Sequence, residues 1–116
     1  MGNTEEKAPE AYSIRISDNA LRHIDDITGY IAYIKHQPLT AIRIGDKIFE
    51  TIDRIEKNPL AFRECREIQT KTKIYRQAVC MSWLIIYKVK ALQIVILGII
   101  HSSRKPSSIK SLRKIK

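Results

Sequence analysis

Three side chains in the second half of the chain could bind an anion or react with one: Arg76, His101 and Arg104. An unperturbed histidine side chain titrates near neutral pH, so His101 is a candidate general base. The two arginines are permanently charged and would form an anion site if they lie at adjacent strand ends. Simpler roles are also open. His101 could end a strand and bond the neighbouring loop, and the arginines could pair with acids of this chain or of a partner.

Aromatic and basic side chains accompany these candidate catalytic residues. The tyrosines of the predicted strands could stack on nucleic-acid bases, or they could pack in the protein with a solvated hydroxyl group. The segment from Arg104 to Lys116 carries six basic residues, which could be solvated or could contact a partner. The predicted contact residues for a target or an antagonist are Tyr75, Tyr87, Lys88, Lys105, Lys110, Arg113 and Lys114.

Charge is divided unevenly along the chain. The first 67 residues contain ten basic and twelve acidic residues, whereas the residues after Glu67 contain eleven basic residues and no acid. The whole chain therefore has a net charge of +9. A half of one sign attracts a polyanion or an acidic protein. Because this half also holds the most apolar segments, we expect it to be a folded surface rather than a disordered tail.

Composition restricts the class of protein. A chain of 116 residues fits one domain. Cys65 and Cys80 are too few for a disulfide framework and lack metal-ligand spacing, so we predict two reduced thiols, no metal and no cofactor. The first residues are polar, and no apolar run approaches the roughly 20 residues of a membrane span. We therefore expect a cytoplasmic protein without a membrane partner.

The first half of the chain predicts a short strand and two helices. Polar and apolar residues alternate over residues 12–17, which is typical of a half-buried strand. Ser17 can cap a helix that continues to about Lys35 with an apolar stripe on one face. Pro38 suits the first turn of a second helix, which Asn58 and Pro59 end. We expect these helices to form an αα-hairpin, with His23 and His36 solvated.

The second half predicts three strands, over residues 74–81, 83–89 and 93–100. Their short connections favour antiparallel neighbours. The predicted fold is α+β, in the order β-α-α-β-β-β, with an antiparallel sheet packed on the helical hairpin. The last two strands are apolar at both parities, so both faces of the sheet should be apolar. The hairpin covers one face, and we expect a protein partner on the other. The alternative is that the chain's own ends cover it.

The order of these segments and the residues within them resemble the RelE/ParE superfamily of toxins from bacterial toxin–antitoxin pairs. The resemblance covers residues 12–106, between a predicted flexible arm at 1–11 and a basic tail at 107–116. It rests on Ser17, Ala20, Ile24 and Ile27, on Tyr30–Ile34, Ala41, Asn58-Pro59 and Tyr75-Arg76, and on the segments Trp83–Val89 and Ile96–Pro106.

This resemblance implies a plasmid-stabilisation toxin that inhibits growth and is neutralised by an acidic antitoxin. RelE-like members cleave messenger RNA on the ribosome, whereas ParE-like members bind DNA gyrase and are not nucleases. Arg104 resembles a family arginine, and Arg76 stands where one strand lysine is expected. However, Ala78 replaces a strand lysine, and Leu84 or Ile85 stands where the RelE-like catalytic arginine is expected. Losing such a group typically costs about a hundredfold or more in rate. We therefore favour a ParE-like binder over the ribosome-dependent endonuclease. A non-toxic nucleic-acid-binding module is the third hypothesis.

Overall fold

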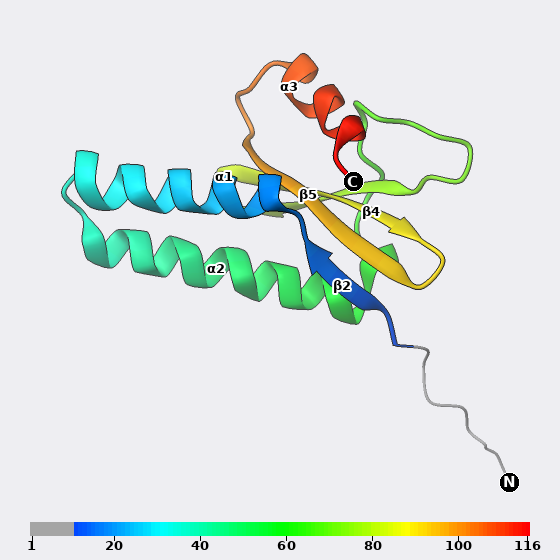
Figure 1. Ribbon diagram of the computed structural model, residues 1–116, viewed down its shortest axis with the longest axis horizontal. Helices are drawn as coiled ribbons and strands as arrows, with labels where there is room; N and C mark the ends of the chain where they lie inside the picture. Colours follow the sequence, from blue (N-terminus) through cyan, green and yellow to red (C-terminus); the bar gives the residue numbers. More distant parts are fainter. Residues whose placement is uncertain (1–10) are drawn as a thin grey trace, which may run out of the picture.

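The computed structural model describes residues 11–116, which form a four-stranded sheet packed against a long helical hairpin (Figure 1). The hairpin projects beyond the sheet at the end where its two helices join. The predicted α+β class and element order are confirmed. The elements are β2 (Ser13–Ile16), α1 (Asp18–Gly29), the π-helix η1 (Tyr30–Ile34), α2 (Pro38–Lys57), the 3₁₀ turn η2 (Pro59–Ala61), β3 (Tyr75–Cys80), β4 (Trp83–Lys90), β5 (Gln93–His101), α3 (Pro106–Lys110) and the 3₁₀ turn η3 (Ser111–Lys114).

Local sequence sets the ends of both helices. The Ser17 hydroxyl accepts a hydrogen bond from the backbone N–H of Ala20 at 3.0 Å, which caps α1 as predicted. The hairpin turns at His36, whose φ is 55°, and α2 then begins on Pro38. The predicted apolar stripe of α2 is buried. One detail differs: the last turn before Lys35 is a π-helix rather than a continuation of α1.

The strand order in the sheet is β2-β5-β4-β3. The pairs β3–β4 and β4–β5 are antiparallel, as predicted, but β2 lies parallel to β5. No tight turn joins β2 to β5, so no hairpin fixes the direction of this pair. The other edge of the sheet is partly occupied, because Glu64 forms a bridge with Arg76.

The hairpin covers one face of the sheet and buries a first core, which includes Ile48, Ile55, Ile85 and Tyr87. The second face is also covered. Cys65 and Ile68 from the long loop and Ile109 and Leu112 from the C-terminal segment pack on Ile86, Val95 and Leu97. The prediction of an open apolar face for a partner is therefore wrong. Two short segments suffice, because each contributes buried apolar side chains while its Lys and Arg residues are exposed.

Helix α1 completes the edge of β5 beyond the end of β2. A register shift between Ile86 and Tyr87 leaves Leu97 as an extra residue in β5. Its carbonyl oxygen accepts hydrogen bonds from Asn19 Nδ2 at 3.0 Å and from Ser17 Oγ at 3.3 Å. These side chains satisfy a backbone group that no neighbouring strand reaches.

Candidate functional site

A cleft of about 800 Å³ lies where the overhanging hairpin meets the ends of β4 and β5. Trp83, His101 and Arg104 contribute from the sheet side. The hairpin contributes apolar side chains and Lys35. Apolar surface and positive charge therefore converge in one concave site, with Asp26 as an acidic member of its lining. The remaining lining residues that matter for this chemistry are Ile27, Tyr30, Ile31 and Ile44.

Strand pairing and a tight turn bring the sheet residues together. Trp83 pairs with His101 across β4 and β5, and their rings meet edge to face with centroids 5.8 Å apart. The backbone N–H of Arg104 then donates to the carbonyl oxygen of His101 at 3.0 Å, which turns the chain at the mouth of the cleft. His101 Nδ1 lies 2.8 Å from Ser103 Oγ and accepts from the Ser103 N–H. His101 thus both bonds its loop, as one interpretation predicted, and faces the cleft.

His23 lies beside this cleft, in a hollow of about 170 Å³ that it shares with Trp83, His101 and Arg104. Its Nδ1 accepts a hydrogen bond from the backbone N–H of Ile99 at 3.0 Å. Partial burial lowers the pKa of His23, and the positive charges of Arg22 and Arg104 act in the same direction against Asp26. The prediction that His23 is a solvated surface residue is therefore wrong, whereas His36 is exposed.

Arg76 lies apart from Arg104. Arg76 pairs with Tyr87 along the sheet, whereas Arg104 follows His101, whose partner is Trp83. Four residues of strand correspond to roughly 13 Å. The Arg76 guanidinium donates instead to the carbonyl oxygens of Phe62 at 2.7 Å and Leu60 at 3.3 Å. The anion site predicted from adjacent arginines is therefore not formed.

The two candidate stacking tyrosines are buried. Tyr87 is fully enclosed, its hydroxyl donates to the Pro59 carbonyl oxygen at 2.6 Å, and burial raises its pKa. Tyr75 is only 7% exposed and belongs to the second core. Both tyrosines therefore pack in the protein, which was one of the two predicted roles. The other role, stacking on nucleic-acid bases, is wrong for this conformation, because a stacking ring must be open to its ligand.

The other predicted contact residues lie on the tail side of the sheet. Lys88 is half-buried and pairs with Tyr75 and Val95, which both belong to the second core. The basic side chains of the tail are exposed, because its apolar residues Ile109 and Leu112 face the sheet. A cationic surface is therefore held in place by the C-terminal segment. It consists of Lys105, Lys110, Arg113 and Lys114.

The thiols and the strand position of the expected arginine have packing roles. Cys65 and Cys80 are buried and free, as predicted, and burial raises the pKa of Cys65. Ile85 is fully buried and Leu84 packs against the second core. Among residues 11–116 we find no group of three or more side chains that could hold a metal ion. Over the same residues, no helix combines the length and apolar character of a membrane span.

Sequence reasoning missed the hairpin side of the cleft. His23, Asp26, Ile27 and Tyr30 recur at spacings of three, one and three, which places them along one side of a helix. This pattern could have marked a helix face that combines polar and apolar groups. The sequence identifies Trp83 as a strand residue. Trp83 lines a cleft because the hairpin extends beyond the end of its strand, and the sequence does not show this.

The fold and the cleft together define a small α+β protein with a partly apolar cleft, lined also by Lys35 and Arg104, between a helical hairpin and a sheet. The chain belongs to the family described as ParE toxin of type II toxin–antitoxin system, parDE, whose model matches residues 14–106. This confirms the predicted ParE-like branch of the RelE/ParE superfamily.

Among solved structures, a chain described as the chromosomal ParDE TA system from P. aeruginosa has a similar fold, with a TM-score of 0.62 and 19% sequence identity. The match covers 78% of this chain and 96% of that chain. A comparison of the sequence with curated proteins finds no match.

Proposed function

We propose that this protein is a growth-inhibiting toxin that binds DNA gyrase and is neutralised by a cognate acidic antitoxin. The observation that carries the proposal is the cleft in which Trp83 and the hairpin's apolar residues meet Arg104 and Lys35. The second support for the proposal is that the chain belongs to the ParE toxin family. The protein would act in the cytoplasm, as part of a plasmid-stabilisation pair.

The chemistry of the cleft indicates what the antitoxin segment should contain. Tyr30, Ile31 and Trp83 offer apolar contacts, and Arg104 and Lys35 offer positive charge at the same site. An amphipathic segment with Asp or Glu beside large apolar side chains would satisfy both. The cleft replaces the second sheet face as the proposed antitoxin site, because Ile109 and Leu112 already cover that face.

The basic tail is the proposed contact with the target. Its exposed cations are Lys105, Lys110, Arg113 and Lys114. The tail packs on the sheet through Ile109 and Leu112, so these charges are presented from a fixed position rather than from a free chain end. Pre-ordering reduces the entropy lost on binding.

The decisive experiment compares two activities of the purified protein. We expect inhibition of gyrase supercoiling and no cleavage of ribosome-bound messenger RNA. Intact supercoiling activity together with messenger cleavage would overturn the proposal in favour of an endonuclease. In that case, replacing Arg76, His101 and Arg104 with Ala one at a time would identify the cleaving groups. Absence of growth arrest on over-expression would instead favour a harmless binding module.

A short upstream gene that encodes an acidic protein would support the proposed pair, and the protein it encodes would then be the ligand for testing the antitoxin site. We expect Arg104→Glu and Trp83→Ala each to weaken its binding by at least tenfold. Lys57→Glu, a charge reversal at the exposed C-terminal end of α2, is the matched control and should bind normally. Equal affinity of all three variants would exclude the cleft as the antitoxin site.

A further inference from the structure

The second face of the sheet, over which the C-terminal segment packs, carries two sets of cations. Three strand cations belong to β2 and β4: Arg15, Lys88 and Lys90. The tail cations are exposed on the C-terminal segment: Lys105, Lys110, Arg113 and Lys114. We propose that the strand cations and the tail cations together bind the phosphate backbone of duplex DNA.

Strand pairing aligns the strand cations on one face. Arg15 on β2 and Lys88 on β4 both lie opposite Val95 of β5, which belongs to the second core. Residues opposite one another in neighbouring strands point to the same face, and so does Lys90, two residues after Lys88. Because neighbouring strands are about 4.8 Å apart, the backbones of Arg15 and Lys88 are separated by roughly 10 Å. Duplex DNA carries one phosphate charge per about 1.7 Å of its axis, so several phosphates fit within such a span.

Acidic residues are concentrated on the other side of the sheet. Of the twelve in the chain, three precede residue 11, seven lie in α1 and α2, and two, Glu64 and Glu67, lie in the loop before β3. The four strands and the residues after Glu67 contain none. Glu64 accepts a hydrogen bond from the Thr70 N–H at 3.4 Å, and Glu67 accepts one from the Cys65 thiol at 3.8 Å. Both loop acids are therefore engaged within their own loop.

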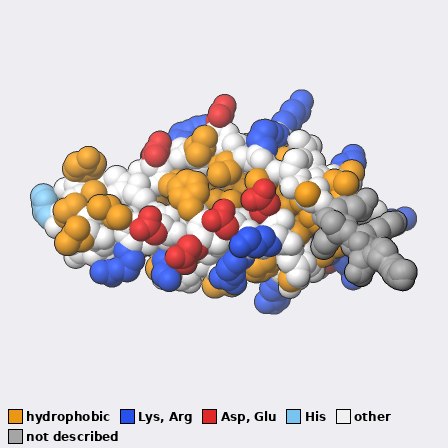
Figure 2. Space-filling model, turned by 90° about the horizontal axis from the view of Figure 1, so that it is seen from below, with side chains coloured by type: hydrophobic (Ala, Val, Ile, Leu, Met, Phe, Trp, Pro, Cys, Tyr) orange, Lys and Arg blue, Asp and Glu red, His pale blue; other side chains and the backbone are white. Residues whose placement is uncertain are grey.

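The cations of the second face keep their full charge. None of them has an acidic partner among residues 11–116, where the one ion pair joins Lys47 to Glu50. The hairpin side is of mixed sign, because acidic side chains lie among Lys and Arg when the molecule is seen from the side of α2 (Figure 2). Cations without acidic partners can displace the counterions that surround DNA, which is the main source of affinity for its backbone.

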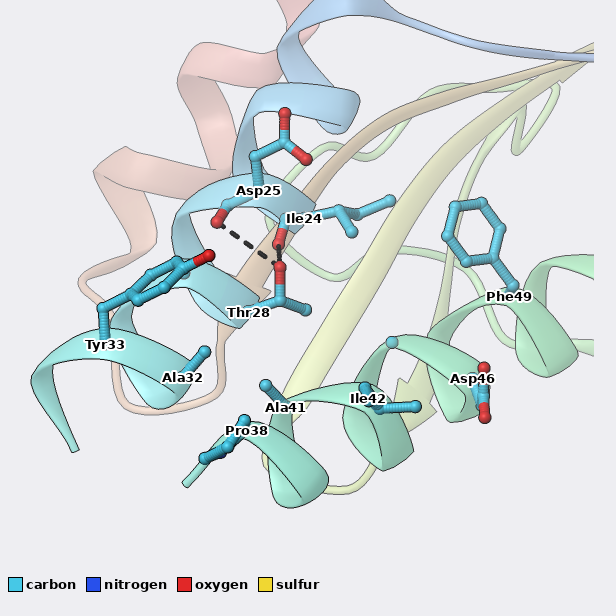
Figure 3. A pocket seen from close by; sticks show the side chains of 12 residues that line it. Ile24, Asp25, Thr28, Ala32, Tyr33, Pro38, Ala41, Ile42, Asp46 and Phe49 are labelled. Atoms are coloured by element: carbon cyan, nitrogen blue, oxygen red, sulfur yellow. Dashed lines mark hydrogen bonds between the residues drawn. The ribbon is translucent and has the colours of Figure 1, made fainter. Parts of the chain in front are cut away.

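The tail also lacks the exposed apolar side chains that protein partners typically bind. Such side chains are common on the hairpin, where Tyr33 and Phe49 line a hollow along α1 and α2 (Figure 3). On the sheet, Val79, Met81 and Leu92 are exposed near strand ends or in turns, and no large apolar side chain after Leu92 is exposed in the described chain. Protein interfaces are usually anchored by aromatic and other apolar groups, whereas phosphates are bound by cations and polar groups. This surface therefore favours nucleic acid over an acidic protein.

The second face suits a duplex better than a single strand. Single-stranded nucleic acid is held largely by stacking of its bases on open aromatic rings. Among the described residues the second core contains one aromatic side chain, Tyr75, which is only 7% exposed. A duplex keeps its bases stacked within itself and presents phosphates outward. DNA is proposed rather than RNA because DNA gyrase is the proposed target, and this choice alone rests on the proposed function.

The test measures binding of the full-length protein to a short DNA duplex by fluorescence anisotropy, at several salt concentrations and without gyrase. We expect the logarithm of the affinity to fall linearly with the logarithm of the salt concentration. Arg15→Glu/Lys90→Glu should weaken binding by at least tenfold and reduce the steepness of this line by about two. Arg43→Glu/Lys57→Glu, which changes the net charge equally at exposed positions of α2, is the matched control and should lose less than threefold.

Urea denaturation shows whether the reversed variant is folded. If it is not, Arg15→Gln/Lys90→Gln, which adds no charge, should still reduce the salt dependence by about two. Equal losses in the strand variant and the α2 control would overturn the proposal, because net charge rather than the second face would then govern binding.

Competitors identify the class of ligand. Poly-L-glutamate of matched charge should displace the DNA at least tenfold less effectively than unlabelled duplex. Equal displacement would overturn the proposal in favour of an acidic protein, and tighter binding of an RNA duplex would overturn the choice of DNA. The gyrase assignment fails separately: DNA binding without inhibition of supercoiling would support this proposal and contradict that one.

Discussion

Arg76 shows how the backbone can engage a side chain that might otherwise bind an anion. Its Nη1 donates to the carbonyl oxygens of Leu60 and Phe62, which ties the long loop to β3. Within residues 11–116, its Nε is buried without a hydrogen-bond partner. Arg76 therefore supports the loop, and the exposed Arg104 is the arginine free to meet a ligand in the cleft.

His23 makes the stability of the protein sensitive to pH. Its Nδ1 can accept the Ile99 N–H only when that nitrogen carries no proton. The folded-state pKa is lowered from about 6.5, so the unfolded chain binds more protons in mildly acidic solution. The stabilisation is present above pH 6.5, and we expect it to be lost as the pH falls below that value.

The measurement is the free energy of unfolding in urea between pH 7.5 and 5. His23→Asn keeps an acceptor near the Nδ1 position but cannot be protonated, so its stability should fall less over this range. His36→Asn, at the exposed tip of the hairpin, is the control and should follow the wild-type curve. Identical pH curves for the wild type and His23→Asn would contradict this assignment.

Gly98 permits the close contact of three segments. A Cβ atom at this position would lie 2.9 Å from Leu112 Cδ2 and 3.1 Å from two atoms of the His23 ring. Gly98→Ala must therefore displace the tail or the ring, and we expect it to cost about 1–3 kcal/mol in the free energy of unfolding. Gly45→Ala, whose new methyl group would meet Thr28 at an ordinary 3.6 Å, is the matched control in the same urea experiment. Equal stability of the two variants would show that the site relaxes freely.

At the scale of elements, the C-terminal segment is part of the sheet's packing and not an appendage. Helix α3 and turn η3 place Ile109 and Leu112 in the second core, opposite the helical hairpin. The same segment carries exposed cations on its outer side. The same segment therefore supplies both the packing and the positive charge. If Ile109 and Leu112 no longer packed on the sheet, the exposed cations would lose their fixed position.

We expect Leu112 to contribute more than Lys110 to the stability of this packing. Leu112→Ala removes buried apolar volume, so we expect a loss of about 2–4 kcal/mol in the free energy of unfolding. Lys110→Ala removes an exposed cation from the same segment and should change stability by less than about 0.5 kcal/mol. Urea denaturation of both variants provides the comparison. Similar losses, or none, would mean that the segment does not hold the second face.

On the scale of the whole molecule, the protein presents two concave surfaces of different charge. The cleft at the strand ends combines apolar side chains with Arg104 and Lys35, whereas a hollow along α1 and α2 combines them with Asp25 and Asp46. The basic tail adds a third surface, on the second face of the sheet. This arrangement would allow target and antitoxin to use separate sites.

The tail's role is tested by reversing charge without touching the core. We expect Lys110→Glu/Arg113→Glu/Lys114→Glu to weaken gyrase inhibition by at least tenfold in a supercoiling assay, because the target would meet negative charge. Lys71→Glu/Lys73→Glu, two reversals in the exposed loop before β3, should have a much smaller effect. Urea denaturation should confirm that both proteins are folded. Full inhibition by the tail variant would remove the tail from the target site.

Much of the fold follows from periodicity. The stripe that includes Ile44, Ile48 and Ile55 identifies α2, and Ser17 and Asn58 mark helix ends. Helical periodicity and helix capping can be read from the sequence because both depend on residues close together in the chain. The parallel pairing of β2 with β5 is not local, so the sequence could not show it. The candidate site was predicted in part. The turn after β5 brings His101 and Arg104 together, but the sheet separates Arg76 from both.

The sequence by itself determined the elements, the segregation of charge and the resemblance to the ParE toxins, since each depends on the types of residue and their spacing along the chain. Only the tertiary structure decided which surfaces are open. It placed Ile109 and Leu112 on the face expected for a partner, buried Tyr87, and opened a cleft beside Trp83. The reason is physical. Exposure depends on which distant segments pack over a side chain, and in this short chain a few apolar residues of the long loop and the tail are enough to close a face.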